Sequence, residues 1–126
     1  MLRRSAKSKG NQFEYEVEFN LRPMYENIFL TKERGFVRQY DLCDDTAKLI
    51  VECKFHRSIS WNEAEKIFKK LIDKSPEGFT KYLIYKTNRQ PVLVMYDETS
   101  PKLTKFSDFF NKPFILRKDA RGDKNE

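Results

Sequence analysis

The first part of the chain carries apolar residues at helical spacing. Either Ser8 or Asn11 can cap the start of this helix, because their side-chain oxygens accept hydrogen bonds from unpaired backbone N–H groups. Pro23 prevents the helix from continuing much beyond Leu21. The apolar stripe that we expect to face the core consists of Phe13, Val17, Leu21 and Met24.

Three strand-like runs follow this helix. Residues 27–32, 36–43 and 48–55 contain β-branched and aromatic side chains, which favour strands. Gly35 marks a turn or bulge between the first two runs. Asp44-Asp45-Thr46 supplies turn residues between the second and third, so these two strands are predicted to form a hairpin.

A second helix is predicted to begin at the capping box formed by Ser60 and Glu63. The Ser-Pro-Glu-Gly run at 75–78 ends it. Its apolar face consists of Trp61, Ala64, Ile67, Phe68, Leu71 and Ile72. Two more strands are expected at 81–85 and 91–96. After Pro101 a short helix is expected through Phe106, Phe109 and Phe110.

The predicted order is α-β-β-β-α-β-β plus a short C-terminal helix, which indicates an α/β protein with a sheet of mixed strand direction. We expect residues 1–9 to form a flexible basic arm and residues 10–116 a single domain. Residues 117–126 are almost wholly polar and are expected to be a disordered tail.

The size and composition exclude several classes of protein. A chain of 126 residues is long enough for one core but not for two. No run approaches the roughly 20 apolar residues of a membrane helix, and the basic N-terminus lacks the apolar stretch of a signal peptide. We therefore expect a cytoplasmic protein that binds no membrane, in which Cys43 and Cys53 are free thiols.

The net charge of +6 favours polyanionic partners, and its distribution along the chain is uneven. The first ten residues contain no acidic side chain, and a cationic arm of this kind can lie along a phosphate backbone. A solvated tail explains the same residues equally well. The basic residues of this arm are Arg3, Arg4, Lys7 and Lys9.

The most informative pattern combines Asp41 with Glu52 and Lys54 on the predicted strand 48–55. Side chains alternate along a strand, so Glu52 and Lys54 point to the same face of an otherwise apolar run. Burying charge is unfavourable unless it is paired or bound to a metal. The predicted hairpin would carry Asp41 back toward Glu52. This cluster indicates a divalent-metal site for phosphodiester cleavage; the alternative for Glu52 and Lys54 is an exposed cross-strand salt bridge.

Four short segments of the chain carry a resemblance to a known family. They are Lys9-Gly10 followed by the helical Glu14, then Tyr40-Asp41-Leu42, then Ile50-Val51-Glu52-Cys53-Lys54, and finally the hairpin 82–95 with its Lys-Thr-Asn-Arg-Gln loop. In this order they resemble the PD-(D/E)XK nucleases, and most closely the archaeal and phage-type Holliday-junction resolvases. The resemblance implies a restriction-endonuclease-like fold, with a mixed central β-sheet flanked by helices. It also implies a structure-selective DNA endonuclease that resolves four-way junctions.

The resemblance implies an Mg²⁺-dependent hydrolytic site, in which Mn²⁺ substitutes for Mg²⁺. Asp41 and Glu52 suit Mg²⁺, which prefers oxygen ligands and commonly uses only one or two carboxylates. The main-chain carbonyl of Cys53 is implied as a third ligand, and Glu14 as a further one, direct or through water. Lys54 would orient or deprotonate the attacking water. Three acids around one point repel one another, so we expect strict metal dependence.

Other acidic residues of the first helix compete with Glu14. Glu18 lies on the same helix face, whereas Glu16 lies about 200° around the helix from Glu14. We prefer Glu14 because of its spacing from Gly10. A solvated helix face is the alternative explanation for all three.

The chain also departs from the family pattern. Tyr40 precedes the aspartate, where the family often has Pro or Gly, and residues 32–39 contain no serine, so we infer no catalytic serine. Asp44 and Asp45 are interpreted as turn residues, and His56 as a surface residue.

Phosphate contacts position a nucleic acid without reading its sequence. The candidate residues for such contacts are Arg3, Arg4, Lys7, Lys9, Arg34, Arg38 and Arg57. Lys86 and Arg89, in the loop between the predicted strands 81–85 and 91–96, are interpreted as solvated turn residues.

A four-way junction has two-fold symmetry, so we expect a homodimer that binds branched DNA. The aromatic residues of 106–116 either cover the protomer's own sheet or form part of the dimer contact. Three alternatives stay open: another PD-(D/E)XK nicking, repair or restriction-type endonuclease, a non-catalytic DNA-binding module, or a basic interaction protein.

Overall fold

The computed structural model describes residues 6–34 and 40–116, with side chains from Gly10 onward. These residues form one sheet whose six strands follow one another in sequence order. Strands β3 and β4 run parallel, and all other neighbouring strands are antiparallel. The strands are β1 (Phe29–Leu30), β2 (Leu42–Asp44), β3 (Leu49–Phe55), β4 (Thr80–Lys86), β5 (Leu93–Tyr96) and β6 (Lys102–Lys105).

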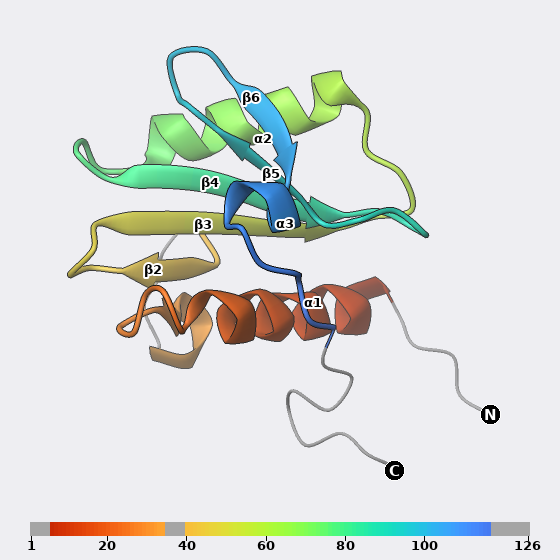
Figure 1. Cartoon of the computed structure of the whole chain (residues 1–126). Helices are drawn as coiled ribbons and strands as arrows, with labels where there is room; N and C mark the ends of the chain where they lie inside the picture. Colours follow the sequence, from red (N-terminus) through yellow and green to blue (C-terminus); the bar gives the residue numbers. More distant parts are fainter. Residues whose placement is uncertain (1–5, 35–39, 117–126) are drawn as a thin grey trace, which may run out of the picture.

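Helices cover both faces of this sheet. Figure 1 shows α1 (Ala6–Leu21) on one face and α2 (Trp61–Lys74) on the other, where α2 connects the parallel strands β3 and β4. A short 3₁₀ helix η1 (Thr31–Arg34) follows β1, and α3 (Phe106–Phe109) follows β6. The α/β class with a mixed, helix-flanked sheet is thereby confirmed. Within the described residues, none of the helices is both long and apolar enough to span a bilayer.

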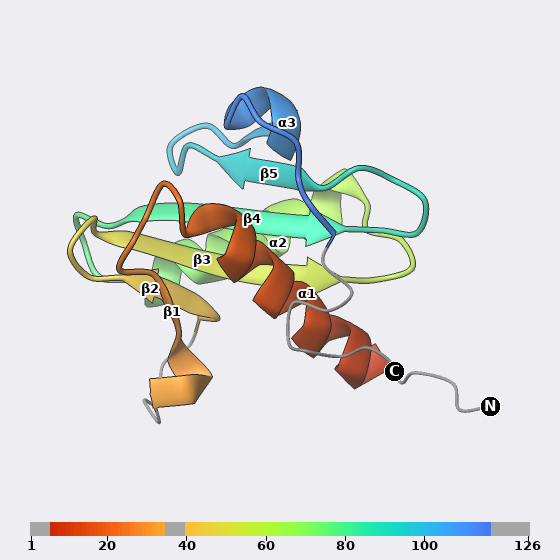
Figure 2. The same ribbon diagram turned by 60° about the horizontal axis from the view of Figure 1, so that its bottom comes forward.

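The core has two halves because both faces of the central strands are buried. On β3, Ile50 packs toward α2, whereas Val51 and Cys53 pack toward α1. This two-sided burial explains why β3 is an almost continuous apolar run. Phe13 and Phe55 meet edge to face with ring centroids 5.8 Å apart, so the first half of α1 lies beneath the C-terminal end of β3. Figure 2 shows α1 crossing that face of the sheet.

The helix boundaries partly differ from those predicted. α1 begins at Ala6, so neither Ser8 nor Asn11 is its cap and the segment predicted as a flexible arm is helical from that residue. Met24 lies beyond the helix and is exposed, not part of the buried stripe. The capping box of α2 is confirmed: Ser60 Oγ accepts from the Glu63 N–H at 3.2 Å, and Glu63 Oε1 accepts from the Ser60 N–H at 2.8 Å.

The strands differ from the prediction more than the helices do. The run 27–32 forms strand only at Phe29–Leu30, because the Thr31 hydroxyl and N–H bond the Tyr40 and Asp41 carbonyls at 2.7 and 3.0 Å, and the chain then turns into η1. Of the run 36–43, only 42 and 43 belong to β2, and 36–39 lie outside the described residues. β6 was not predicted; it has four residues and pairs only with β5.

The aromatic residues after β6 pack on the protomer's own sheet. Phe106 is fully buried, and Phe114 lies 5.0 Å from Phe106 and 6.0 Å from Phe13 between ring centroids. The Asn20 side chain holds this segment against α1: its Nδ2 donates to the Ile115 carbonyl at 2.9 Å, and its Oδ1 accepts from the Ile115 N–H at 2.7 Å. The predicted tail 117–126 and the residues 1–5 lie outside the described residues.

Candidate active site

Strand pairing brings Asp41 beside β3. In the β2–β3 ladder Leu42 pairs with Val51, and the Asp41 N–H donates to the Val51 carbonyl at 3.1 Å. The Asp41 carboxylate then accepts a hydrogen bond from the Cys53 N–H at 2.8 Å. The aspartate is therefore held against the backbone next to Glu52, although eleven positions separate the two in sequence.

Glu52 and Lys54 lie next to each other on the α2 side of β3. Their closest charged atoms, Nζ of Lys54 and Oε2 of Glu52, are 3.7 Å apart, which is longer than a hydrogen bond. The Glu52 side chain is 12% exposed, whereas that of Lys54 is 35% exposed. Within the described residues, the buried Oε1 of Glu52 has no hydrogen-bond partner. A buried carboxylate oxygen without a donor is costly, so this pair is not a satisfied salt bridge.

Glu14 approaches the site from α1. Its Oε1 lies 3.0 Å from the Nζ of Lys32, which also donates to the Asn11 side chain at 3.1 Å. Burial raises the pKa of Glu14, and the nearby Asp41 raises it further by charge repulsion and by a hydrogen bond between the two carboxyl groups. Glu18, the rival on the same helix face, instead forms an ion pair with Arg22. Glu14 is thus the carboxylate of α1 whose pKa is raised by Asp41.

The carboxyl groups of this site all hold protons more tightly than usual. Burial raises the pKa of Glu52 to about 7, with repulsion from Asp41 as the second cause and the charges of Lys74 and Lys54 opposing it. Burial also raises the pKa of Asp41, against the Cys53 hydrogen bond and nearby lysines. Burial is the first cause for all three carboxyl groups, so the raised pKa values show that the site solvates carboxylate charge poorly.

The Cys53 thiol is not a nucleophile here. It is buried, and burial together with the charges of Asp41, Glu14 and Glu52 raises its pKa well above the ordinary value. A thiol reacts as its thiolate, so this cysteine stays inert. Its backbone contributes instead: the N–H binds Asp41, and in a strand the C=O of the same residue points to the same side.

Two lysines belong to this site that the sequence analysis did not identify. Lys74, in the last turn of α2, lies close enough for its charge to lower the pKa of both Asp41 and Glu52. Lys32 contacts Glu14 and lies 5.2 Å from the ring centroid of Tyr15. No local motif marks either residue, because both reach the site only through the packing of η1 and α2 against the sheet.

The donor set fits a hard divalent cation that retains water ligands. Within the described part of the chain, no group of three or more His, Cys, Asp or Glu side chains is already gathered closely enough to hold a metal ion. Mg²⁺ needs fewer, since it commonly uses one or two carboxylates and keeps several waters. Asp41 and Glu52 offer such a pair, and the partnerless Oε1 of Glu52 is an oxygen that a cation would satisfy.

The candidate phosphate-binding residues are only partly described. Arg3, Arg4 and Arg38 lie outside the described residues, and Lys7 and Lys9 lie in α1 without described side chains. Arg34 is exposed on η1, with its guanidinium 4.0 Å from the ring centroid of Phe29. Arg57 is exposed directly beyond β3. Of the seven candidates, Arg57 lies closest in the chain to Lys54.

Asp44, Asp45 and His56 take the roles expected of them, whereas Lys86 is the last residue of β4 and is partly buried instead of being a solvated turn residue. Asp44 is buried and accepts from the Ala47 N–H at 2.8 Å, and Asp45 accepts from the Cys43 thiol at 3.1 Å, so both stabilise the β2–β3 turn. His56 is exposed. The Lys86 ammonium donates to the carbonyls of Thr87 and Gln90 and holds the β4–β5 turn.

Comparison of the chain with protein-family models, with curated proteins and with solved structures found no match. Any functional conclusion therefore has to rest on the site itself and on the fold that positions it.

Proposed function

We propose that this protein is a metal-dependent DNA endonuclease of the PD-(D/E)XK type that resolves four-way junctions. One observation carries the proposal. The backbone of β3 holds Asp41 next to Glu52, and Glu52 keeps a buried oxygen without a partner in the described chain. A buried carboxylate oxygen without a donor is costly, and a divalent cation bound there would satisfy it.

The order of the elements supports a restriction-endonuclease-like core. A helix precedes three antiparallel strands, and a crossover helix then leads to a fourth strand parallel to the third. Glu14 lies on α1, Asp41 directly precedes β2, and Glu52 and Lys54 lie on β3. The proximity of Asp41 to both Glu14 and Glu52 supports the proposal that these residues share a site.

Each residue of the cluster has a distinct task in phosphodiester hydrolysis. When bound, Mg²⁺ would polarise a phosphoryl oxygen and lower the pKa of a water molecule. Asp41, Glu52 and the Cys53 carbonyl would hold the ion, and Glu14 would hold one of its waters. Lys54 is partly exposed, so its ammonium can contact both the attacking water and the phosphate. The water oxygen bonds to phosphorus as the P–O bond to the leaving strand breaks. The leaving oxygen then takes up a proton.

Selectivity for branched DNA is proposed from the resemblance. The candidate cations suit phosphate contacts, which position DNA without reading its sequence. Because a four-way junction is two-fold symmetric, two protomers would place one site on each of two opposed strands.

The test is cleavage of end-labelled synthetic DNA in Mg²⁺, comparing a four-way junction with a flap and with a linear duplex of the same arm sequence. We expect paired nicks near the branch point, an intact duplex and no cleavage in excess chelator. Asp41→Asn should abolish the nicks without weakening junction binding.

Other outcomes would redirect the proposal. Equal cleavage of junction, flap and duplex would indicate a general nuclease with the same catalytic site. If no divalent metal supports cleavage although the junction is bound, the protein is a binding module and the catalytic proposal fails.

A further inference from the structure

A basic surface with an exposed tryptophan lies at one end of the sheet, beyond the candidate active site. β3 and β4 are parallel and pair in register up to Phe55 and Lys86, so they end together. Two main-chain hydrogen bonds continue the pairing: the His56 N–H donates to Lys86 at 3.2 Å, and the Asn88 N–H donates to Arg57 at 3.4 Å. The β3–α2 segment and the β4–β5 turn therefore run side by side.

We select four exposed residues of these two segments together with the exposed first residue of α2 and call them the strand-end surface; its members are His56, Arg57, Trp61, Asn88 and Arg89. Its charge is mainly positive, although the exposed Glu63 in the first turn of α2 lies close enough to His56 for their charges to interact. Residues 53–62 and 86–96 contain no acidic side chain, and neither Arg57 nor Arg89 makes an ion pair within the described residues. Arg89 has a positive φ of 61°, in a turn closed by the Gln90 N–H donating to Thr87 at 3.2 Å. The turn thus holds the Arg89 guanidinium on a backbone of defined conformation.

Trp61 is the aromatic member of this surface. It is the first residue of α2 and remains 44% exposed, although it shares its helical stripe with the fully buried Ala64, Phe68 and Leu71. The buried residues of that stripe face the sheet. Trp61 extends the stripe to the N-terminal end of α2, which lies next to the C-terminal ends of β3 and β4. Ser60 and Glu63 fix this first turn through the capping box. The exposed Trp61 indole is therefore a flat aromatic surface on a helix end of fixed conformation, and it is not part of the hydrophobic core.

The strand-end surface begins directly after the candidate active site along the chain. Arg57 follows Lys54 by three residues, a spacing of about 10 Å in an extended chain. In Figure 1, β3 and β4 end on the side where α2 begins. A strand whose phosphate lies at Lys54 would therefore continue over Arg57.

We propose that the strand-end surface binds the DNA strand beside the scissile phosphate, with Arg57 and Arg89 on its phosphates and the Trp61 indole stacked on an unpaired base. This inference rests on the proposed nuclease function. Aromatic rings bind unpaired bases of any sequence, whereas bases stacked inside a duplex are not accessible to them. Trp61 would accordingly favour DNA with unstacked bases at a branch point and disfavour continuous duplex.

Contact between Trp61 and DNA can be followed by tryptophan fluorescence, because Trp61 is the only tryptophan in the chain. The first experiment is tryptophan fluorescence of the full chain in excess chelator, titrated with a four-way junction, with single-stranded DNA and with a blunt duplex. We expect strong quenching by the junction and the single strand, and little by the duplex. Equal quenching by the duplex, or none by any of the three, would overturn the proposal.

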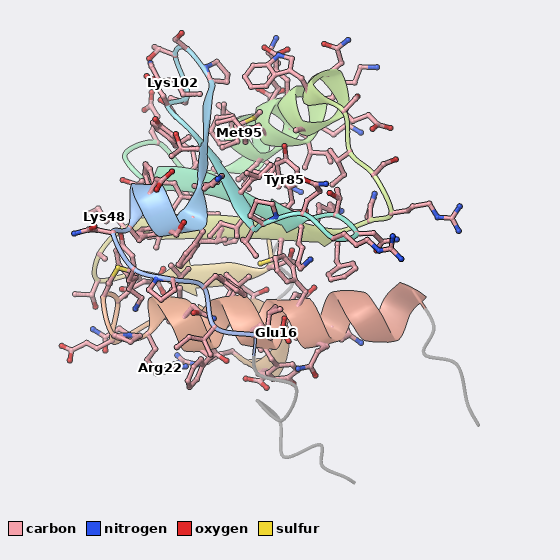
Figure 3. The ribbon with its side chains drawn as sticks, turned by 45° about the vertical axis from the view of Figure 1, so that its right-hand side comes forward. Glu16, Arg22, Lys48, Tyr85, Met95 and Lys102 are labelled. Carbon is pink, nitrogen blue, oxygen red and sulfur yellow. The ribbon has the colours of Figure 1, made fainter. Side chains whose placement is uncertain are left out.

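Variants then separate stacking from charge. Trp61→Ala should weaken junction binding by about tenfold, whereas Trp61→Phe, which keeps a ring, should bind within about twofold of wild type. Arg57→Gln and Arg89→Gln should each reduce the slope of log affinity against log salt by about 1. Arg22→Gln is the matched control, since it removes the same charge from an exposed arginine just past α1, far from the strand ends (Figure 3). Wild-type affinity in Trp61→Ala would overturn the proposal.

These experiments use no catalysis, so the two hypotheses can fail separately. Quenching and weakened variants without any metal-dependent cleavage would support the strand-end surface and refute the nuclease. Junction cleavage by a protein whose tryptophan does not respond to DNA would support the nuclease and refute the surface. Circular dichroism of each variant confirms that a loss of affinity is not a loss of fold.

Discussion

Two clusters of acids and lysines lie on the same sheet, and they differ in how completely their charges are satisfied. The residues proposed to carry catalysis, here called the catalytic cluster, are Glu14, Asp41, Glu52 and Lys54. The turn cluster, at the start of β4 and in the β5–β6 connection, consists of Lys81, Asp97, Glu98 and Lys102. Both place carboxylates beside ammonium groups, so composition alone does not distinguish them.

In the turn cluster every charge has a close partner. Lys81, whose side chain is only 6% exposed, contacts Glu98 at 2.5 Å, and Lys102 contacts Asp97 at 2.7 Å. Asp97 also accepts from the hydroxyl of Thr99 at 2.8 Å. Hydrogen bonds from Lys102, Thr99 and Ser100 lower the pKa of Asp97, and Asp97 in turn raises the pKa of Lys102. This is the behaviour of structural ion pairs.

The catalytic cluster shows the opposite behaviour. Its one acid–lysine contact on β3 is 3.7 Å long, Glu52 keeps a partnerless oxygen in the described chain, and burial raises the pKa of Glu14, Asp41 and Glu52. Raised pKa values in a buried charged cluster are more typical of functional sites than of structural ion pairs. The comparison supports the proposal that the incompletely paired cluster, and not the cluster of tighter ion pairs, binds a ligand.

The largest difference between the two clusters should appear in the rate of DNA cleavage. Glu52→Gln should lower the rate of Mg²⁺-dependent junction cleavage by about 1,000-fold, which corresponds to about 4 kcal/mol of activation free energy. Glu98→Gln, which also removes a lysine-paired carboxylate, should leave the rate within about twofold of wild type. Single-turnover cleavage of a labelled junction measures both. A comparable loss in the two variants would contradict the distinction between the clusters.

The next effect concerns stability against pH in chelator. Glu52 has a pKa of about 7 in the folded chain against an ordinary value of 4.5, so the folded state binds more protons between these values. The free energy of unfolding should fall by about 3 kcal/mol as pH rises from about 4.5 to 7, and Asp41 and Glu14 act in the same direction. Urea unfolding at a series of pH values measures this loss.

Glu52→Gln supplies the control for that pH series. The neutral side chain cannot ionise, so the variant should lose most of the pH dependence and be more stable than wild type above pH 7. If the wild type and the variant respond to pH alike, Glu52 does not hold its proton as described.

A smaller effect should follow from adding Mg²⁺ at pH 8. A ligand that binds only the folded state stabilises it by about 2.7 kcal/mol at 100 times its Kd. Wild type and Asp97→Asn should both gain melting temperature with Mg²⁺, and chelator should reverse the gain. Glu52→Gln should gain much less. An equal gain in all three proteins would place the cation outside the catalytic cluster.

The smallest effect should come from the turn cluster itself. Glu98→Gln leaves the nearly buried Lys81 without a charged partner, but Glu98 is half exposed, so water can partly replace it. We expect a loss of about 1 kcal/mol in the free energy of unfolding, without a change in Mg²⁺ response. Urea unfolding of this variant with and without Mg²⁺ checks both parts.

Locally encoded features could be predicted from the sequence. β3 follows from its run of β-branched residues, the start of α2 from the Ser60–Glu63 capping box, and the shared face of Glu52 and Lys54 from strand alternation. β6 and the shortness of β1 could not be predicted in this way. β6 is four residues long and depends on pairing with β5, and β1 ends where Thr31 bonds carbonyls nine and ten residues ahead.

By itself the sequence determined which residues could form a charged strand site: Asp41, Glu52 and Lys54 are separated by a turn and a strand, and their chemistry and spacing are local. Only the tertiary structure decided the rest. It brought Lys32 and Lys74 to the acids, left Glu52 without a full set of partners and exposed Trp61 at the end of its apolar stripe. The physical reason is that burial and long-range charge depend on how η1, α2 and the strand ends pack, and no short stretch of sequence encodes that packing.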